Sequence, residues 1–271
     1  LFSKPDEAYH YAYVLHLRSG EGLPLVDVGQ AHHRAVEMEA HQPPLYYLLV
    51  AGVSSLAPTG LDQLPKPNPH FLSTEVGNLN IWTPAYVASP LDLPVFYAGR
   101  LTSMLFGMFL PWPTTVLVIL LFAFNPQFVF ISTSFSNDLA GVATVQAAIW
   151  QIGLAMRRGL TLPRVVVLGV CIAIATMAKL GGIGLLGVVA LLGLWEGWKA
   201  RSARPIVWAL AGAAVALALN GWWFWRNWSF YQDPLALNMV PLLIGTRATP
   251  MNWSDYSSIL QFVWKAYWLD F

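Results

Sequence analysis

Two acidic residues near the start of the chain are the first whose type and position could support chemistry. Asp6 and Glu7 follow Pro5 and precede an aromatic and apolar run over residues 8–15. This order is typical of a helix start, where carboxylates interact favourably with the positive end of the helix dipole. Capping alone could explain both residues. The functional alternative is that a carboxylate at a membrane surface, beneath aromatic side chains, acts as a general base.

A second group has the residue types of a metal site. His33, Glu37 and His41 recur every four residues, a spacing that would align three potential ligands on one helical face. The prolines that follow Gln42 stop a helix, so it would end at or before His41. Solvated loop residues are the simpler interpretation, and a metal site is the alternative.

A third group consists of charged residues at the ends of apolar segments. Its members are Asp138, Lys179, Arg226 and Asp233. Each one alone fits a side chain that reaches from a helix end to the membrane surface. Together on one face, the two cations would suit an anionic lipid headgroup such as a phosphate. Four tryptophans surround Arg226 and predict an aromatic belt at a membrane boundary: Trp222, Trp223, Trp225 and Trp228.

The composition indicates what must position these groups. Of 271 residues, 56% are hydrophobic and 11% charged, whereas a soluble domain carries roughly a quarter charged residues. With a mean hydropathy of +0.52, the chain belongs to the integral membrane class. Its net charge is +1 and its cations are scattered, which excludes a nucleic-acid partner. The single cysteine, Cys171, excludes an intramolecular disulfide and a CxxC motif, and we expect it to be a packing residue.

Five apolar stretches are long enough, or nearly so, for the roughly 20 residues that a membrane-spanning helix needs. They cover residues 94–111, 114–135, 139–156, 165–198 and 206–225. The fourth would be about 51 Å long as one helix. It carries Lys179 near its middle, followed by Gly181 and Gly182. We therefore expect two spans joined at Lys179, which avoids about 2.5 kcal/mol or more for a charge at the bilayer centre.

With six spans, the basic loops 157–164 and 199–204 fall on one side, which the positive-inside rule makes cytoplasmic. Residues 1–93, the 136–138 turn, the Lys179 turn and the segment after Arg226 then lie outside. The expected fold is all-α, a polytopic transmembrane helix bundle over 94–225. External segments 1–93 and 226–271 flank it, and the second leads into a further, truncated helix.

Within the external loop we expect two juxtamembrane helices, at about 7–19 and 43–58. The second is too short to span comfortably, so it should lie along the outer interface or dip into the membrane and return, with Tyr46 and Tyr47 as interface anchors. The abrupt polar start and the aromatic end at 264–271 predict an incomplete chain.

Six short segments, in order and with matching sidedness, resemble the polytopic GT-C fold glycosyltransferases. That family includes protein O-mannosyltransferase-like and aminoarabinose-transferase-like bacterial enzymes. The similar segments are residues 5–7 with their aromatic helix, 39–47, Arg100 at a span start, 136–138, 176–182, and 225–227 with 231–234.

The resemblance implies inverting transfer of a sugar from a polyprenyl-phosphate donor in the plasma membrane to an acceptor on the outer face. Asp6, with Glu7 beside it, is implied as the catalytic carboxylate that deprotonates the acceptor hydroxyl. Lys179 and Arg226 would bind the departing lipid phosphate. One carboxylate suffices as the base of a single displacement, and a phosphate leaving group needs cationic stabilisation.

The same resemblance gives supporting roles to three further residues. Glu39 and His41 would shape the acceptor side, and Asp138 would support the base or orient a donor hydroxyl. The lipid-linked sugar is then the donor, membrane lipids are partners, and a divalent metal is left open. Complete members of the family have a span before the Asp-Glu loop and several more after residue 234, so this chain would hold about half of one.

Two other functions compete with an enzyme. A non-catalytic accessory subunit could keep the fold and pack into a larger membrane complex, binding lipids or pigments with its tryptophan-rich helices. Asp6 and Lys179 facing a shared cavity open to lipid would favour the enzyme. A transporter fits less well, because the sequence has no evident inverted repeat with broken helices in matching halves.

Overall fold

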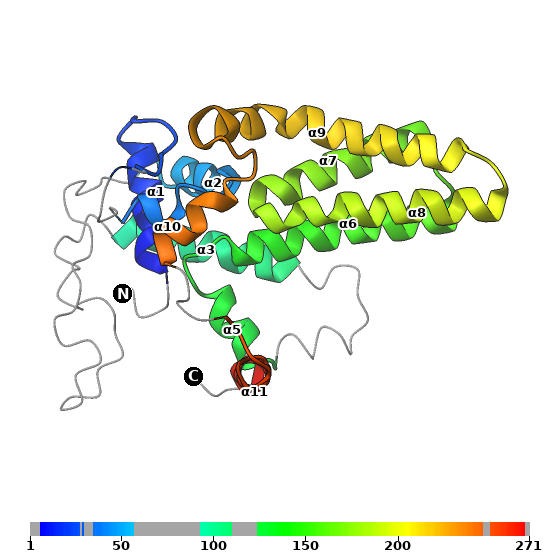
Figure 1. The fold of residues 1–271 in the computed structure, drawn as a ribbon. Coiled ribbons are helices and arrows are strands. Elements are labelled where there is room, and N and C mark those ends of the chain that lie inside the picture. Colours follow the sequence, from blue (N-terminus) through cyan, green and yellow to red (C-terminus); the bar gives the residue numbers. More distant parts are fainter. Residues whose placement is uncertain are drawn as a thin grey trace.

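The computed structural model describes residues 6–27, 29, 35–56, 93–109, 124–245 and 250–268. Every regular element in these ranges is helical (Figure 1), which confirms the all-α class. The elements are α1 (Glu7–Arg18), η1 (Glu37–Glu39), α2 (Leu45–Val53), α3 (Leu93–Phe109), α5 (Pro126–Ser132), α6 (Asp138–Arg158), α7 (Leu162–Ala178), η3 (Leu180–Gly184), α8 (Leu185–Ala200), α9 (Arg204–Tyr231), η4 (Leu237–Met239), α10 (Val240–Ile244) and α11 (Trp253–Trp268).

Among the described residues, three helical segments are long and apolar enough to cross a membrane: α6, the combined η3 and α8, and α9. Helix α7 is also apolar but is shorter than these three, with 17 residues. Large apolar side chains cover the outward faces of these helices; Leu191 and Trp198, for example, are 68% and 72% exposed. A surface of this kind requires an apolar environment such as lipid. Cys171 packs against the core between α6, α7, α8 and α9, as expected of a packing residue.

The stretch 165–198 divides at Lys179, as predicted. Lys179 has extended backbone with φ −154° and ψ 133°, which ends α7, and η3 then turns the chain into α8. Figure 1 shows α6, α7, α8 and α9 side by side, with α7 and α8 running in opposite directions. Gly182 lets this turn fold tightly onto α7, because an added Cβ would collide with the backbone of Ala175.

The prediction of one continuous helix over 114–135 is wrong in its described part. Asn125 has extended backbone, and its side-chain oxygen accepts a hydrogen bond from the Phe128 amide at 2.8 Å. This cap starts α5 at Pro126, where a missing N–H costs nothing. The helix ends at Ser132, so only seven residues are helical. Residues 114–123 lie outside the described part.

Helices α1, α2 and α3 pack together at one end of the bundle around an aromatic core. Tyr46 and Tyr47 are fully buried in it, so the prediction of interface anchors is wrong. The Tyr46 hydroxyl donates to the Gly99 carbonyl oxygen at 3.0 Å, and the Tyr47 ring stacks on Tyr13 at a centroid distance of 3.8 Å. Helix α2 instead turns Leu48 and Val53 outward.

The two ends of the bundle differ in chemistry. Helices α1 and α2, the 136–138 turn, the Lys179 turn and residues 231–244 lie at one end, and the basic loops 157–164 and 199–204 lie at the other (Figure 1). This matches the predicted grouping of polar segments. Near the first end, Trp222, Trp225 and Trp228 are exposed as a belt requires, whereas Trp223 is fully buried.

Candidate functional site

Glu7 forms a buried ion pair that holds α1 against α3. The Arg100 guanidinium donates from Nε and Nη2 to the two carboxylate oxygens, both at 2.9 Å. The Phe135 amide donates to Oε1 at 2.8 Å, and the Glu7 side chain is fully buried. A carboxylate with these partners cannot reach an acceptor hydroxyl. The geometry therefore gives Glu7 a structural role in place of the predicted catalytic one.

Asp6 starts α1 without capping it. Its backbone is left-handed, with φ 63° and ψ −8°, and its side chain makes no capping hydrogen bond. A capping residue normally has extended backbone, so this conformation turns the carboxylate away from the free amides of the helix. Capping therefore does not explain Asp6. Partial burial and then the nearby charge of Asp138 raise the pKa of Asp6, and the charge of Lys179 acts in the opposite direction.

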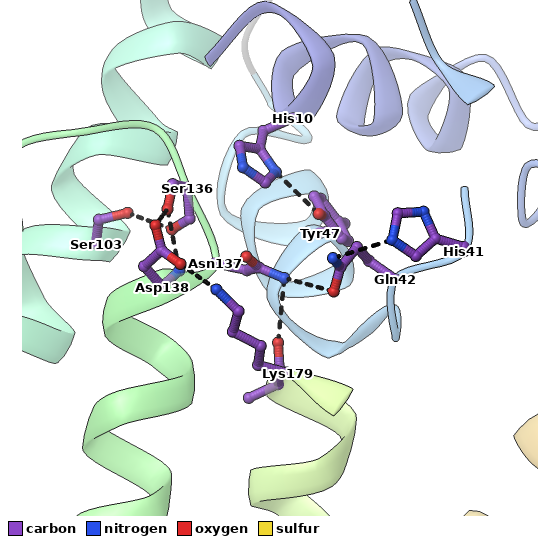
Figure 2. Close-up of polar contacts among 10 residues, drawn as sticks. His10, His41, Gln42, Tyr47, Ser103, Ser136, Asn137, Asp138 and Lys179 are labelled. Carbon is purple, nitrogen blue, oxygen red and sulfur yellow. Dashed lines mark hydrogen bonds and ion pairs between the residues drawn. The ribbon is translucent and has the colours of Figure 1, made fainter. Parts of the chain in front are cut away.

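Asp138 and Lys179 form an ion pair across the end of the bundle (Figure 2). Asp138 opens α6, and its Oδ2 accepts a hydrogen bond from the Ser136 hydroxyl at 2.8 Å. Gly141, one turn further along α6, leaves room for the Lys179 stem, because an added Cβ would lie 2.8 Å from Lys179 Cβ. The two charged side chains are 40% and 42% exposed, so a ligand can reach both.

Glu39 lies close to this pair and is a weaker acid than usual. Burial is the main cause, followed by the charge of Asp6, and together they raise the pKa of Glu39 to about 8. The Tyr47 hydroxyl hydrogen-bonds to Glu39 and lies 2.9 Å from His10 Nδ1. Burial lowers the pKa of His10 to about 4, so at neutral pH this imidazole is uncharged.

His41 and Gln42 form the rim of the cluster shown in Figure 2. Gln42 Nε2 lies 3.3 Å from His41 Nε2, and the Asn137 amide reaches Gln42 Oε1 and the Ala178 carbonyl oxygen, each at 3.5 Å. Burial lowers the pKa of His41. The cluster therefore joins residues from the loop before α2, the start of α6 and the end of α7.

The predicted metal ligands are not on one α-helical face. Glu37 belongs to the three-residue turn η1, is fully buried and accepts a hydrogen bond from the Asp27 amide at 3.3 Å. His41 follows η1 outside any helix, as the prolines predicted. His33 lies outside the described residues. Within the described ranges, no three His, Cys, Asp or Glu side chains are placed to hold a metal ion.

Arg226 belongs to a neighbouring part of the same end. Its Nη2 donates to the Pro24 carbonyl oxygen at 2.6 Å, and its guanidinium lies 4.7 Å from the centre of the Trp223 ring. The charges of Arg226 and Glu39 both act on the pKa of Tyr13, so both groups lie near that residue. Asp233 accepts hydrogen bonds from the Leu235 and Asn238 amides of its own loop. The four predicted charges thus form one ion pair and two separately held groups.

The groups around Asp6 and Lys179 can take up a proton and bind an anion. Asp6 is a carboxylate with a raised pKa, and Lys179 is an accessible cation close to it. His10, Ser136 and Asn137 belong to the cluster, but sequence reasoning did not assign them roles. The Ser-Asn-Asp order of residues 136–138 was the available signal for two of them. Nothing in the spacing of His10 indicated a contact with Tyr47.

Comparison of the chain with protein-family models, with curated proteins and with solved structures gives no match in any of the three.

Proposed function

We propose that this chain is part of a membrane glycosyltransferase that moves a sugar from a polyprenyl-phosphate donor to an acceptor. The observation that carries the proposal is the neighbourhood of Asp6, Asp138 and Lys179 at one end of an apolar helix bundle. Here a partly buried carboxylate and an accessible cation share a site, beside helices that a lipid-linked donor could approach from the membrane. The motif resemblance over residues 5–234 supports the same activity.

The proposed reaction is a single displacement at the anomeric carbon. The acceptor hydroxyl oxygen bonds to that carbon, the bond from the carbon to the phosphate oxygen breaks, and the hydroxyl proton passes to Asp6. Lys179 stabilises the charge that develops on the leaving phosphate. Asp138 orients the Lys179 ammonium through their ion pair. The configuration at the anomeric carbon is inverted.

The pKa directions support Asp6 as the base. A general base works best when its pKa approaches the working pH, and the pKa of Asp6 is raised from its ordinary value. Glu39, with a pKa of about 8, is mostly protonated at neutral pH and would donate a hydrogen bond to the acceptor. His41 would contact the acceptor at the rim.

Arg226 has a secondary place in the proposal. Its hydrogen bond to Pro24 ties α9 to the loop before η1, and its stacking on Trp223 leaves the guanidinium half-buried. In the proposed enzyme it adds positive charge on the side of Glu39 and Tyr13, as a second cation for the lipid phosphate. The site lies on the outer face of the plasma membrane, opposite the cytoplasmic basic loops.

The test is Asp6→Asn in the full-length protein, assayed for sugar release from purified polyprenyl-phosphate sugars. Loss of a general base should slow turnover about 10²- to 10⁴-fold. Glu21→Gln is the matched control, because Glu21 is exposed near the same end and, within the described ranges, bonds only to Ser19 and His16. Undiminished turnover by Asp6→Asn would remove Asp6 from the mechanism. No release by the wild type from any donor would favour a non-catalytic accessory subunit.

A further inference from the structure

A cavity of about 270 Å³ lies at the end of the bundle opposite α1 (Figure 1). It is formed where α6 ends, α8 ends and α9 begins. Glu196 and Ala200 line it from α8, and Arg204 and Trp208 line it from α9. The proposed glycosyl transfer uses none of these residues.

The chain segments that meet at this cavity are rich in basic residues. Residues 157–164 and 196–204 contain six Lys or Arg residues and one acidic residue, Glu196. Glu196 is already paired with Lys199 at 3.4 Å, and Arg164 donates to the carbonyl oxygens of Arg158 and Gly159. The side chain of Arg204 has no hydrogen-bond or ion-pair partner in the described part of the chain. A cation that lines the cavity is therefore free to bind an anion.

Two donors on α9 complement Arg204. Ala203 provides no side-chain cap. The Arg204 amide already donates to the Ser202 hydroxyl at 3.2 Å, Pro205 has no N–H, and the Val207 amide donates to the Ala203 carbonyl oxygen. In the described part of the chain, the Ile206 amide is therefore the donor of the first turn that is left for another acceptor. The indole nitrogen of Trp208 is buried and has no hydrogen-bond partner within the described ranges. A buried N–H without a partner is costly, and a ligand oxygen in the cavity would satisfy it after a small side-chain movement.

The surface next to the cavity is apolar. Trp195 and Trp198 are exposed near the end of α8, as Leu162 is at the start of α7 and Val207 is one turn into α9. Tryptophans at this position are typical of the membrane boundary, where headgroups meet acyl chains. The cavity is smaller than the usual pocket for a whole ligand, so it suits a headgroup whose chains remain outside.

We propose that this cavity binds the phosphate of an anionic membrane phospholipid, held by Arg204 and the start of α9, with its acyl chains along α8 and α9. Basic pockets between membrane helices commonly bind lipid headgroups in this way. The inference does not depend on the proposed glycosyltransferase activity.

The experiment is native mass spectrometry of the full chain in neutral detergent, titrated with short-chain phosphatidylglycerol. We expect one saturable site, with binding at least about tenfold weaker to phosphatidylcholine. Arg204→Gln should weaken phosphatidylglycerol binding about tenfold, as expected for a lost charged hydrogen bond. Ala200→Trp should weaken it similarly by filling the cavity without changing the charge. Arg201→Gln is the matched control, because Arg201 is exposed but does not line the cavity.

Wild-type affinity in both Arg204→Gln and Ala200→Trp would overturn the proposal, because binding would then be a diffuse property of the basic loops. Equal affinity for inorganic phosphate would overturn the lipid as ligand and indicate a site for free anions. Melting temperatures recorded in phosphatidylcholine establish that each variant is folded. If Ala200→Trp does not fold, Arg204→Gln decides the result, since its change lies on an exposed side chain.

Discussion

Replacing Glu7 by glutamine tests whether this carboxylate is structural. The substitution keeps the shape of the side chain and an oxygen that can accept from the Phe135 amide. It removes the negative charge opposite Arg100, whose Nε and Nη2 both bond to Glu7 at 2.9 Å. The guanidinium would then lose its charged partner, and the Phe96 ring, whose centre lies 4.5 Å away, would remain beside it.

The expected cost follows from burial. Breaking a buried ion pair by removing one partner costs about 3–5 kcal/mol. Glu7 is fully buried, but the Arg100 side chain is 23% exposed and can reach some solvent, which favours the lower end of that range. We therefore expect Glu7→Gln to lose about 3 kcal/mol of unfolding free energy.

Thermal unfolding of the purified protein in detergent, followed by circular dichroism, measures this loss. Arg100→Met combined with Glu7→Gln should recover much of it, because no uncompensated charge remains. Glu21→Gln, an exposed acid-to-amide change, should shift the melting temperature little. A Glu7→Gln protein as stable as the wild type would refute the structural role and return Glu7 to the candidates for catalysis.

The remaining predictions concern pH and helix packing. Glu39 has a pKa of about 8 in the folded protein, against an ordinary value of 4.5. Between these two pH values the folded protein holds a proton that the unfolded chain releases. The free energy of unfolding therefore falls as the pH rises through this range, by up to about 5 kcal/mol in total. Glu39→Gln should abolish that slope in melting curves at pH 5 and pH 8; an unchanged slope would contradict it. Gly169→Ala should lower the melting temperature, because an added Cβ would lie 2.6 Å from the Gly212 carbonyl oxygen. Gly153→Ala, with nothing within 4 Å, is the control and should be neutral or stabilising.

Local patterns in the sequence predicted the features that a single segment determines. The charge and glycines after residue 178 located the break between α7 and α8, because a lysine avoids the apolar centre of a membrane wherever it stands. The start of α1 after Asp6 was predicted from the acidic residues beside it, which is also a local signal. The helix start after Asn125 was not predicted, because the capping side chain begins a new helix inside a stretch that is apolar on both sides.

Features that depend on distant contacts could not be predicted. Glu7 and Arg100 are 93 residues apart, and no periodicity connects them. Tyr46 and Tyr47 have the composition of interface anchors, but the direction in which α2 faces depends on its packing against α1 and α3. The site was predictable as a set of charges at one end of the bundle. Its division into the Asp138–Lys179 pair and a separate Arg226 was not, because side-chain partners follow from the packing of the helices.

The short connection between α7 and α8, which consists of Lys179 and the five residues of η3, bears on how the chain enters a bilayer. Two apolar helices joined so closely should insert together as a hairpin, and one end of the hairpin must then cross the hydrocarbon. If the Lys179 end crosses, one cation passes through the hydrocarbon. If the opposite end crosses, the loops 157–164 and 199–204 pass through it with six cations. At about 2.5–3.5 kcal/mol per charge, entry with Lys179 leading is much less costly. Asp138 is synthesised 41 residues earlier, so a partner for the ammonium already exists when Lys179 arrives.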